Sequence, residues 1–302
     1  MSGRQKAGTV ELEARFAEAL TSITAEPVEM AARARTGVYA SYVKLLRDAG
    51  EYSRAEGWLR RGIAETESVL GVDTLELAVL LNELGIIGKY RGNFNEAERA
   101  YQRALAIHEL HGAAVSASVA AILHNLGGLA HERGDARTAE PFARRGIAVR
   151  QAMPDSDPIA LAADWGALSA ILIDLGDLDE AEAVLTEVLA IYDKAYGPEH
   201  YEVAVTLHNL GSLHYRQGDF AGAVDTLRRA QQVKQIALGS RHPDLAITLY
   251  NLACSLQRRD DVVGAVRCLT EAIDILDGVV TQTQPTFVAC HNRLNELTGK
   301  SS

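Results

Sequence analysis

The stretch VAVTLHNLGSLHYRQGDFAGAVDTLRRAQQVKQIALGSRHPD, from Val203 to Asp244, decides the fold because its pattern recurs along the chain every forty-two residues. Three residue types follow this step. A glycine recurs at Gly50, Gly92, Gly134, Gly176 and Gly218, an alanine at Ala55, Ala97, Ala139, Ala181, Ala223 and Ala265, and a leucine at Leu84, Leu126, Leu168, Leu210, Leu252 and Leu294. A period kept without insertion or deletion predicts a solenoid built from one repeated unit.

Each unit is predicted to be a pair of helices. Apolar residues recur every three or four positions on both sides of a break at Gln217-Gly218-Asp219, which is the helical period interrupted once. Glycine allows the left-handed residue that ends a helix, and aspartate caps the N–H groups of the next helix. The recurring alanine is expected where the second helix, helix B, closely approaches the first, helix A.

These residues resemble the tetratricopeptide repeat, in the long form found in kinesin light chains and in similar bacterial proteins. The resemblance rests on Leu207 to Gly211 (LHNLG), the Gly218-Asp219 turn, Ala223, and Leu238 to Asp244 (LGSRHPD), and it extends from about Ala34 to Thr298. Asp260 stands where the turn glycine is expected, and the linkers after Leu110 and Ala152 lack the His-Pro dipeptide. The resemblance implies an all-α fold, a right-handed α-solenoid of six hairpins.

Solenoids need caps, because an end repeat otherwise shows its apolar face to water. The apolar stripe from Val10 to Thr24 predicts a cap helix at the start of the chain. We therefore expect a disordered tail at residues 1–8, an N-terminal capping helix within 9–33, six hairpins over 34–284, and a capping helix and tail over 285–302. This organisation predicts fourteen helices.

Composition restricts the kinds of partner. The net charge of -10 and the pI near 5.4 argue against binding to a nucleic-acid backbone. Cys254, Cys268 and Cys290 are too few for a disulfide framework, which favours a reducing, cytoplasmic location. The chain shows neither an apolar leader at its start nor a run of about eighteen apolar residues, so we expect a soluble protein that does not contact a membrane.

The resemblance also implies that the A helices line a concave groove in which a peptide binds. Groove residues are expected at the family's fifth, ninth, twelfth and thirteenth positions of helix A, and at the asparagine pair of its LNNL segment. We expect the groove to include Asn82, Lys89, His124, Asn125, His131, His208, Asn209, Tyr215, Arg216, Tyr250, Asn251, Arg258 and Asn292. Amide and guanidinium groups can donate to a peptide's main chain and carboxylates, and aromatic rings can anchor its side chains.

Three features qualify this site. In kinesin-light-chain-like repeats an asparagine pair contacts cargo peptide, but His124, His208 and Tyr250 stand at the first asparagine position here. In the fourth repeat, Gly166 leaves a gap that could be a pocket floor, or it could simply allow close packing beside Trp165. Arg216 and Arg258 lie toward the C-terminal end, where an acidic segment would bind best.

The main functional hypothesis is a non-enzymatic adaptor that binds a protein or peptide segment. A regulatory protein that responds to a signal peptide or small molecule is the first alternative, and an enzyme that uses His124, His131 and His208 is the second. The histidine spacing is too open for a preformed zinc site, so we expect no metal and no cofactor. Self-association is left open, because the last hairpin lacks its turn glycine.

Overall fold

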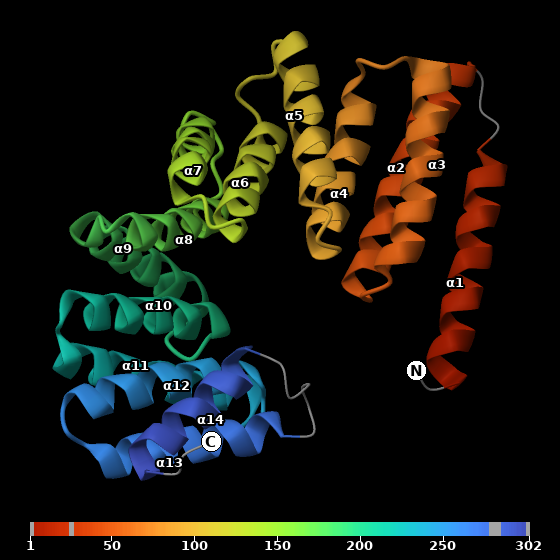
Figure 1. Cartoon of the computed structure of the whole chain (residues 1–302). Coiled ribbons are helices and arrows are strands. Elements are labelled where there is room, and N and C mark those ends of the chain that lie inside the picture. The colour runs from red at the N-terminus through yellow and green to blue at the C-terminus, as the bar shows by residue number, and fades with distance from the viewer. Residues whose placement is uncertain (1–2, 24–26, 278–284, 300–302) are drawn as a thin grey trace. The chain divides into compact units, whose positions relative to one another are not determined.

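The computed structural model describes residues 3–23, 27–277 and 285–299, and every regular element in those residues is a helix (Figure 1). The fourteen helices are α1 (Gly3–Ser22), α2 (Val28–Asp48), α3 (Tyr52–Leu70), α4 (Leu75–Tyr90), α5 (Phe94–Leu110), α6 (Ala117–Glu132), α7 (Ala136–Gln151), α8 (Pro158–Leu175), α9 (Leu178–Tyr196), α10 (Tyr201–Gln217), α11 (Phe220–Leu238), α12 (Asp244–Arg258), α13 (Val262–Leu276) and α14 (Pro285–Thr298).

Six pairs of consecutive helices form antiparallel hairpins: α2 with α3, α4 with α5, α6 with α7, α8 with α9, α10 with α11, and α12 with α13. The first member of each pair is the A helix and the second is the B helix. α1 packs against α2, and α14 packs against α12 and α13. The all-α fold of repeated hairpins with a helix at each end, predicted from the period, is confirmed.

The chain divides into two compact units, residues 1–155 and 156–302. The first unit contains α1 to α7, and the second contains α8 to α14. Within each unit, the B helix of one hairpin packs against the A helix of the next, as α3 does against α4 and α11 against α12.

The recurring small residues lie where the two helices of a hairpin meet. All six alanines of the repeat have 0% exposure. The approach is closest beside a glycine of helix A: a Cβ atom at Gly85 would lie 2.3 Å from the Tyr101 ring, and one at Gly211 would lie 2.5 Å from Leu227 Cγ. Real Cβ atoms do not come this close to other atoms. Glycine is therefore required at these two crossings by the packing.

The turn between helices A and B depends on a left-handed residue. Gly50, Gly92, Gly134, Gly176 and Gly218 all have positive φ, between 74° and 89°. Asp260 takes the same conformation with φ of 61°, although it has a side chain. The side chains of Asp135, Asp219 and Asp261 cap the following helix, whereas those of Asn93 and Asp177 form no capping hydrogen bond.

The N-terminal boundaries differ from the sequence-based expectation. α1 begins at Gly3, so residues 3–8 are helical where a disordered tail was expected, and no proline interrupts that stretch. α2 begins at Val28, because Pro27 stands at its N-cap, and the first hairpin therefore starts before residue 34. Residues 1–2, 24–26, 278–284 and 300–302, which the expected tails, cap and last hairpin include, lie outside the described residues.

Among the described residues, one helix is long and apolar enough to cross a membrane by length and composition: α8, with 18 residues and a mean hydropathy of 1.5. The helix contains Asp164 and Asp174, so it does not contradict the expectation that no uninterrupted run of about eighteen apolar residues occurs. The core helix of a helical fold meets the same criteria, and α8 packs against α9 in the second unit.

Candidate binding surface on the A helices

The thirteen residues expected in the groove lie on the A helices and on α14, and we call the surface that they form within each unit its A face. In the first unit, α4 carries Asn82 and Lys89, and α6 carries His124, Asn125 and His131. In the second unit, α10 carries His208, Asn209, Tyr215 and Arg216, α12 carries Tyr250, Asn251 and Arg258, and α14 carries Asn292. Arg216, Arg258 and Asn292 are exposed, and the other ten are half-buried.

In the first unit, A-face side chains bond from one repeat to the next. The Asn125 side-chain amide donates to Asn82 Oδ1 at 3.0 Å, and Lys89 Nζ lies 2.9 Å from Glu132 Oε1. His124 and His131 also interact with other residues of the fold. The polar groups of this surface therefore hold each other in place before any ligand arrives.

In the second unit, the two arginines expected to meet an acidic ligand already have partners. Arg216 donates to the Ile173 carbonyl oxygen at 2.8 Å and to Asp174 at 3.2 Å. The guanidinium of Arg258 lies over the Phe220 ring, 4.3 Å from its centroid, and Tyr215 packs edge-on against the same ring. Both arginines remain exposed, so these contacts orient the guanidinium groups without covering them.

His208 differs from the open groove residue that the sequence led us to expect. Its Nδ1 lies 3.1 Å from Thr248 Oγ1, and Asn251 donates to Ser212 Oγ at 3.0 Å beside it. Burial, helped by the charge of Lys234, lowers the pKa of His208 to about 4. The ring is therefore neutral at pH 7 and bonded to Thr248. It also belongs to the second unit, whereas His124 and His131 belong to the first.

A buried ion pair behind His208 escaped the sequence-based analysis. Lys234 of α11 is only 2% exposed, and its Nζ lies 2.8 Å from Asp244 Oδ2. The Tyr201 hydroxyl donates to the same carboxylate at 3.2 Å. Burial alone would raise the pKa of Asp244, but the hydrogen bond and charge of Lys234 outweigh it and lower that pKa. The repeat register was the available signal, since Tyr192 and Leu276, forty-two residues to either side of Lys234, are also buried.

The half-buried thiol of Cys254 in α12 is also held by its neighbours. Arg293 of α14 bonds both the Tyr250 hydroxyl and the Cys254 thiol. Burial raises the pKa of the Cys254 thiol, which disfavours the reactive thiolate. In the part of the chain that is described, no three His, Cys, Asp or Glu side chains gather closely enough to hold a metal ion.

The gap expected in the fourth repeat is present as open space. A Cβ atom at Gly166 would meet nothing within 4 Å, so close packing does not explain this glycine. Trp165 beside it is partly buried against the apolar cluster of α8, α9 and α10.

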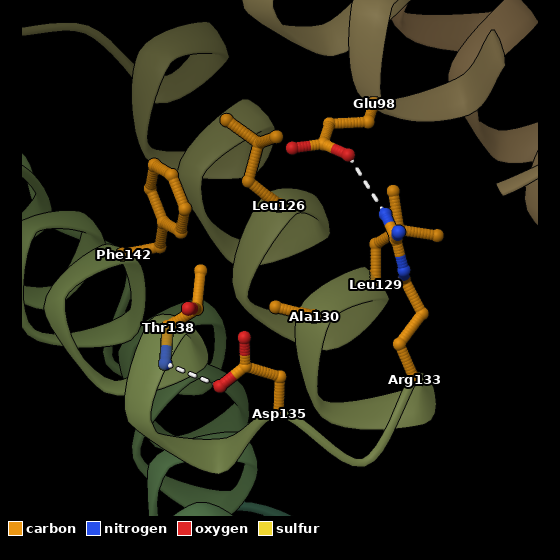
Figure 2. Close-up of a pocket in the computed structure, with 8 residues that line it drawn as sticks. All are labelled: Glu98, Leu126, Leu129, Ala130, Arg133, Asp135, Thr138 and Phe142. Atoms are coloured by element: carbon orange, nitrogen blue, oxygen red, sulfur yellow. Dashed lines mark hydrogen bonds and ion pairs between the residues drawn. The ribbon is translucent and has the colours of Figure 1, made fainter. Parts of the chain in front are cut away.

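Two of the hollows in the first unit are lined by residues of α5 and α6. One, of 270 Å³, lies between α4, α6 and the end of α5, and Asn82 is among its lining residues. The other, of 480 Å³, lies between α5, α6 and α7 (Figure 2). Leu126 and Phe142 give it apolar walls, and a 2.8 Å ion pair between Glu98 and Arg133 closes one side. The second hollow contains none of the thirteen expected residues.

Comparison with known proteins identifies the repeat. Residues 76–152 and 160–236, just over half of the chain, match the tetratricopeptide-repeat family. The chain belongs to the tetratricopeptide-repeat family. No curated protein sequence matches it.

Solved structures of other tetratricopeptide-repeat proteins share the fold. A variant of a putative kinesin light chain from Podosopora anserina, with nearly identical TPR-like repeats, is 22% identical (TM-score 0.56), and the match covers 65% of this chain and 92% of that chain. The apo form of the quorum sensor NprR from B. thuringiensis is 13% identical (TM-score 0.70), and the match covers 97% of this chain and 77% of that chain. The signal-transduction ATPase PH0952 from Pyrococcus horikoshii has a tetratricopeptide-repeat sensor. It is 14% identical (TM-score 0.70), and the match covers 90% of this chain and 40% of that chain. At these identities the likeness shows the fold alone.

Proposed function

We propose that this tetratricopeptide-repeat protein is a non-enzymatic adaptor that binds a peptide segment of a partner protein on its A face. The observation that carries the proposal is the 270 Å³ hollow between α4 and α6, which combines the polar side chains of Asn82 and Glu83 with apolar walls. Such a mixture suits a peptide, because its side chains need apolar pockets and its main chain needs hydrogen-bonding groups.

The bonds between repeats support the same proposal. Asn82 and Asn125 are fixed by each other, and Lys89 is fixed by Glu132, so a ligand would not have to order these side chains. A surface ordered in advance binds with a smaller entropic cost. Where a peptide reaches the second unit, the exposed guanidinium groups of Arg216 and Arg258 favour acidic residues. Each such pair contributes about 0.2–1 kcal/mol, so charge orients the peptide more than it holds it.

Selection from a peptide library displayed on phage, with the full chain as bait, tests the proposal. Binding of a retained peptide is then measured for the wild type, Val79→Glu and Val263→Glu. Val79 lines the hollow and is 44% exposed, whereas Val263 is 83% exposed at the start of α13. We expect Val79→Glu to weaken binding at least tenfold and Val263→Glu to leave it unchanged. Equal binding by all three proteins, or no retained peptide, would contradict the proposal.

A regulatory role is the second candidate, and one observation favours it: the division of the chain into two compact units. In a regulatory protein, the ligand must bind one conformation better than another. Small-angle scattering of the full chain with and without the retained peptide distinguishes the two roles. A change in the radius of gyration on binding favours regulation, and an unchanged value favours a rigid adaptor.

A further inference from the structure

The 270 Å³ hollow contains a histidine whose ring nitrogen has no partner. His108, in the last turn of α5, lines the hollow and is only 6% exposed. Its Nδ1 is buried and has no hydrogen-bond partner among the described residues. An unpaired buried polar group costs free energy, so a group that bonded to this ring would be favoured there. A half-turn of the ring exchanges Nδ1 with Cδ2 without changing its outline, so the nitrogen can turn toward a ligand.

The repeat supplies an internal comparison for this position. Three periods later, Lys234 stands in the place of His108 and Asp244 in the place of Ser118, which also lines the hollow. There the two side chains meet in the 2.8 Å ion pair. In the described part of the first unit, no hydrogen bond joins His108 to Ser118, and an open hollow lies in the place of the internal pair.

The preceding repeat also provides internal partners for both positions, although the two side chains do not bond each other. Thr66 stands one period before His108 and bonds Thr36 at 3.0 Å, and Glu76 stands one period before Ser118 and pairs with Arg33. The fold thus satisfies these two positions from within where the first hairpin meets the second and where the fifth meets the sixth. The hollow between α4 and α6 is where the equivalent polar group is left for another molecule.

The charges around the hollow select the kind of ligand. Glu83 is the acidic residue among those that line it, and Arg47 pairs with it at 2.7 Å. Burial lowers the pKa of His108, helped by the nearby His111, so the imidazole is neutral at pH 7. The lining therefore offers no unpaired charge to a charged ligand group, which would lose hydration without gaining a counter-ion.

We propose that the hollow between α4 and α6 holds an uncharged, hydroxyl-bearing side chain of the bound peptide, and that His108 selects this side chain by a hydrogen bond. Threonine is the residue expected there. A hydroxyl group both donates and accepts, so it satisfies the ring nitrogen in either tautomer. The threonine methyl group rests against Ala78 and Ile122, which are buried at the base of the hollow. This inference rests on the proposed peptide binding and adds the identity of one anchor.

The test uses the peptide retained from the displayed library. Each hydroxyl residue is replaced in turn by valine, aspartate or lysine, and affinity is measured by calorimetry against the full chain. At one position, wild type should prefer threonine to the isosteric valine by about tenfold, because valine leaves the nitrogen unpaired. His108→Phe should remove this preference, since phenylalanine keeps the ring and loses the nitrogen.

Two further variants copy the internal pair of the second unit. His108→Lys combined with Ser118→Asp should fill the hollow with an ion pair, keep the helical circular dichroism of the wild type, and reduce peptide affinity about tenfold or more. Ser118→Asp alone changes an exposed position and should shift the anchor preference from threonine to lysine. That change of specificity cannot result from unfolding.

The outcomes separate the two proposals. If a retained peptide is sensitive to Val79→Glu but shows no preference for threonine over valine, the role of His108 is overturned and peptide binding on the A face stands. If threonine is preferred equally by wild type and His108→Phe, the role of His108 is again overturned. If wild type retains no peptide, both proposals fail.

Discussion

At the scale of single residues, Asp260 is strained where the repeat prefers glycine. Its φ of 61° is a conformation that costs an L-residue roughly 1 kcal/mol, and its side chain is exposed. We expect Asp260→Gly to raise the free energy of unfolding by up to about 1 kcal/mol, because relief of strain exceeds the entropy lost by glycine. The reverse change at the equivalent turn, Gly218→Asp, should lower it by a similar amount. Urea unfolding measures both, and effects of the same sign would refute the argument.

A second residue-scale prediction concerns pH. The folded pKa of His208 is about 4, whereas a free histidine has an ordinary pKa of 6.5, so the unfolded chain binds more protons between these values. Stability therefore rises with pH across this window, is complete above pH 6.5, and is lost as pH falls toward 4. The loss reaches up to about 3 kcal/mol. Urea unfolding at pH 7, 5.5 and 4 should show that the free energy of unfolding falls less in acid for His208→Asn than for wild type. Equal losses in the two proteins would contradict the assignment of the acid loss to His208.

The sequence predicts the position of a residue more reliably than its surroundings. Period and helical spacing placed His208 on the A helix, but Lys234, which adds to the lowered pKa, comes from a B helix. His108 was missed for the same reason, because it lies at the end of a B helix and reaches a hollow between two A helices. The apolar period of one helix does not show which side chains a neighbouring helix brings close to it.

At the scale of helices, the crossing of α4 and α5 depends on a glycine. A Cβ atom at Gly85 would lie 2.3 Å from the ring of Tyr101, which is fully buried and has no room to move. We expect Gly85→Ala to destabilise the protein by about 1–3 kcal/mol, the usual cost of overpacking. Gly57 in α3 is the matched control, because a Cβ atom there meets nothing within 4 Å. Gly57→Ala should stabilise by about 1 kcal/mol through helix propensity, and thermal unfolding of both variants tests the contrast.

The helix boundaries were predictable where the residues that determine them act on their immediate surroundings. The turn glycines and the recurring alanines were sufficient to predict the hairpins, because each acts through its own backbone or its nearest neighbour. The start of α2 was misplaced, since the resemblance was traced only from Ala34, whereas Pro27 already provides the N-cap. Contacts such as Asn125 with Asn82 join neighbouring repeats and depend on which side chain the next repeat presents.

At the scale of the whole molecule, each compact unit has apolar clusters of its own. Two of the apolar clusters lie in residues 1–155 and two in residues 156–302. In repeat proteins, stability is approximately a sum of terms from each repeat and its neighbours. The two units are therefore expected to respond separately to a local change.

The two tryptophans make this expectation measurable, because Trp58 lies in the first unit and Trp165 in the second. Trp58 packs edge-on against Phe16, and Trp165 packs on the cluster that includes Leu207, next to His208 in sequence. In Trp165→Phe, fluorescence reports the first unit, and in Trp58→Phe it reports the second. Adding His208→Asn at pH 7 should shift the urea midpoint reported by Trp165 and leave that reported by Trp58 unchanged, because the lost hydrogen bond to Thr248 belongs to the second unit. Equal shifts of both midpoints would show that the chain unfolds as one cooperative body.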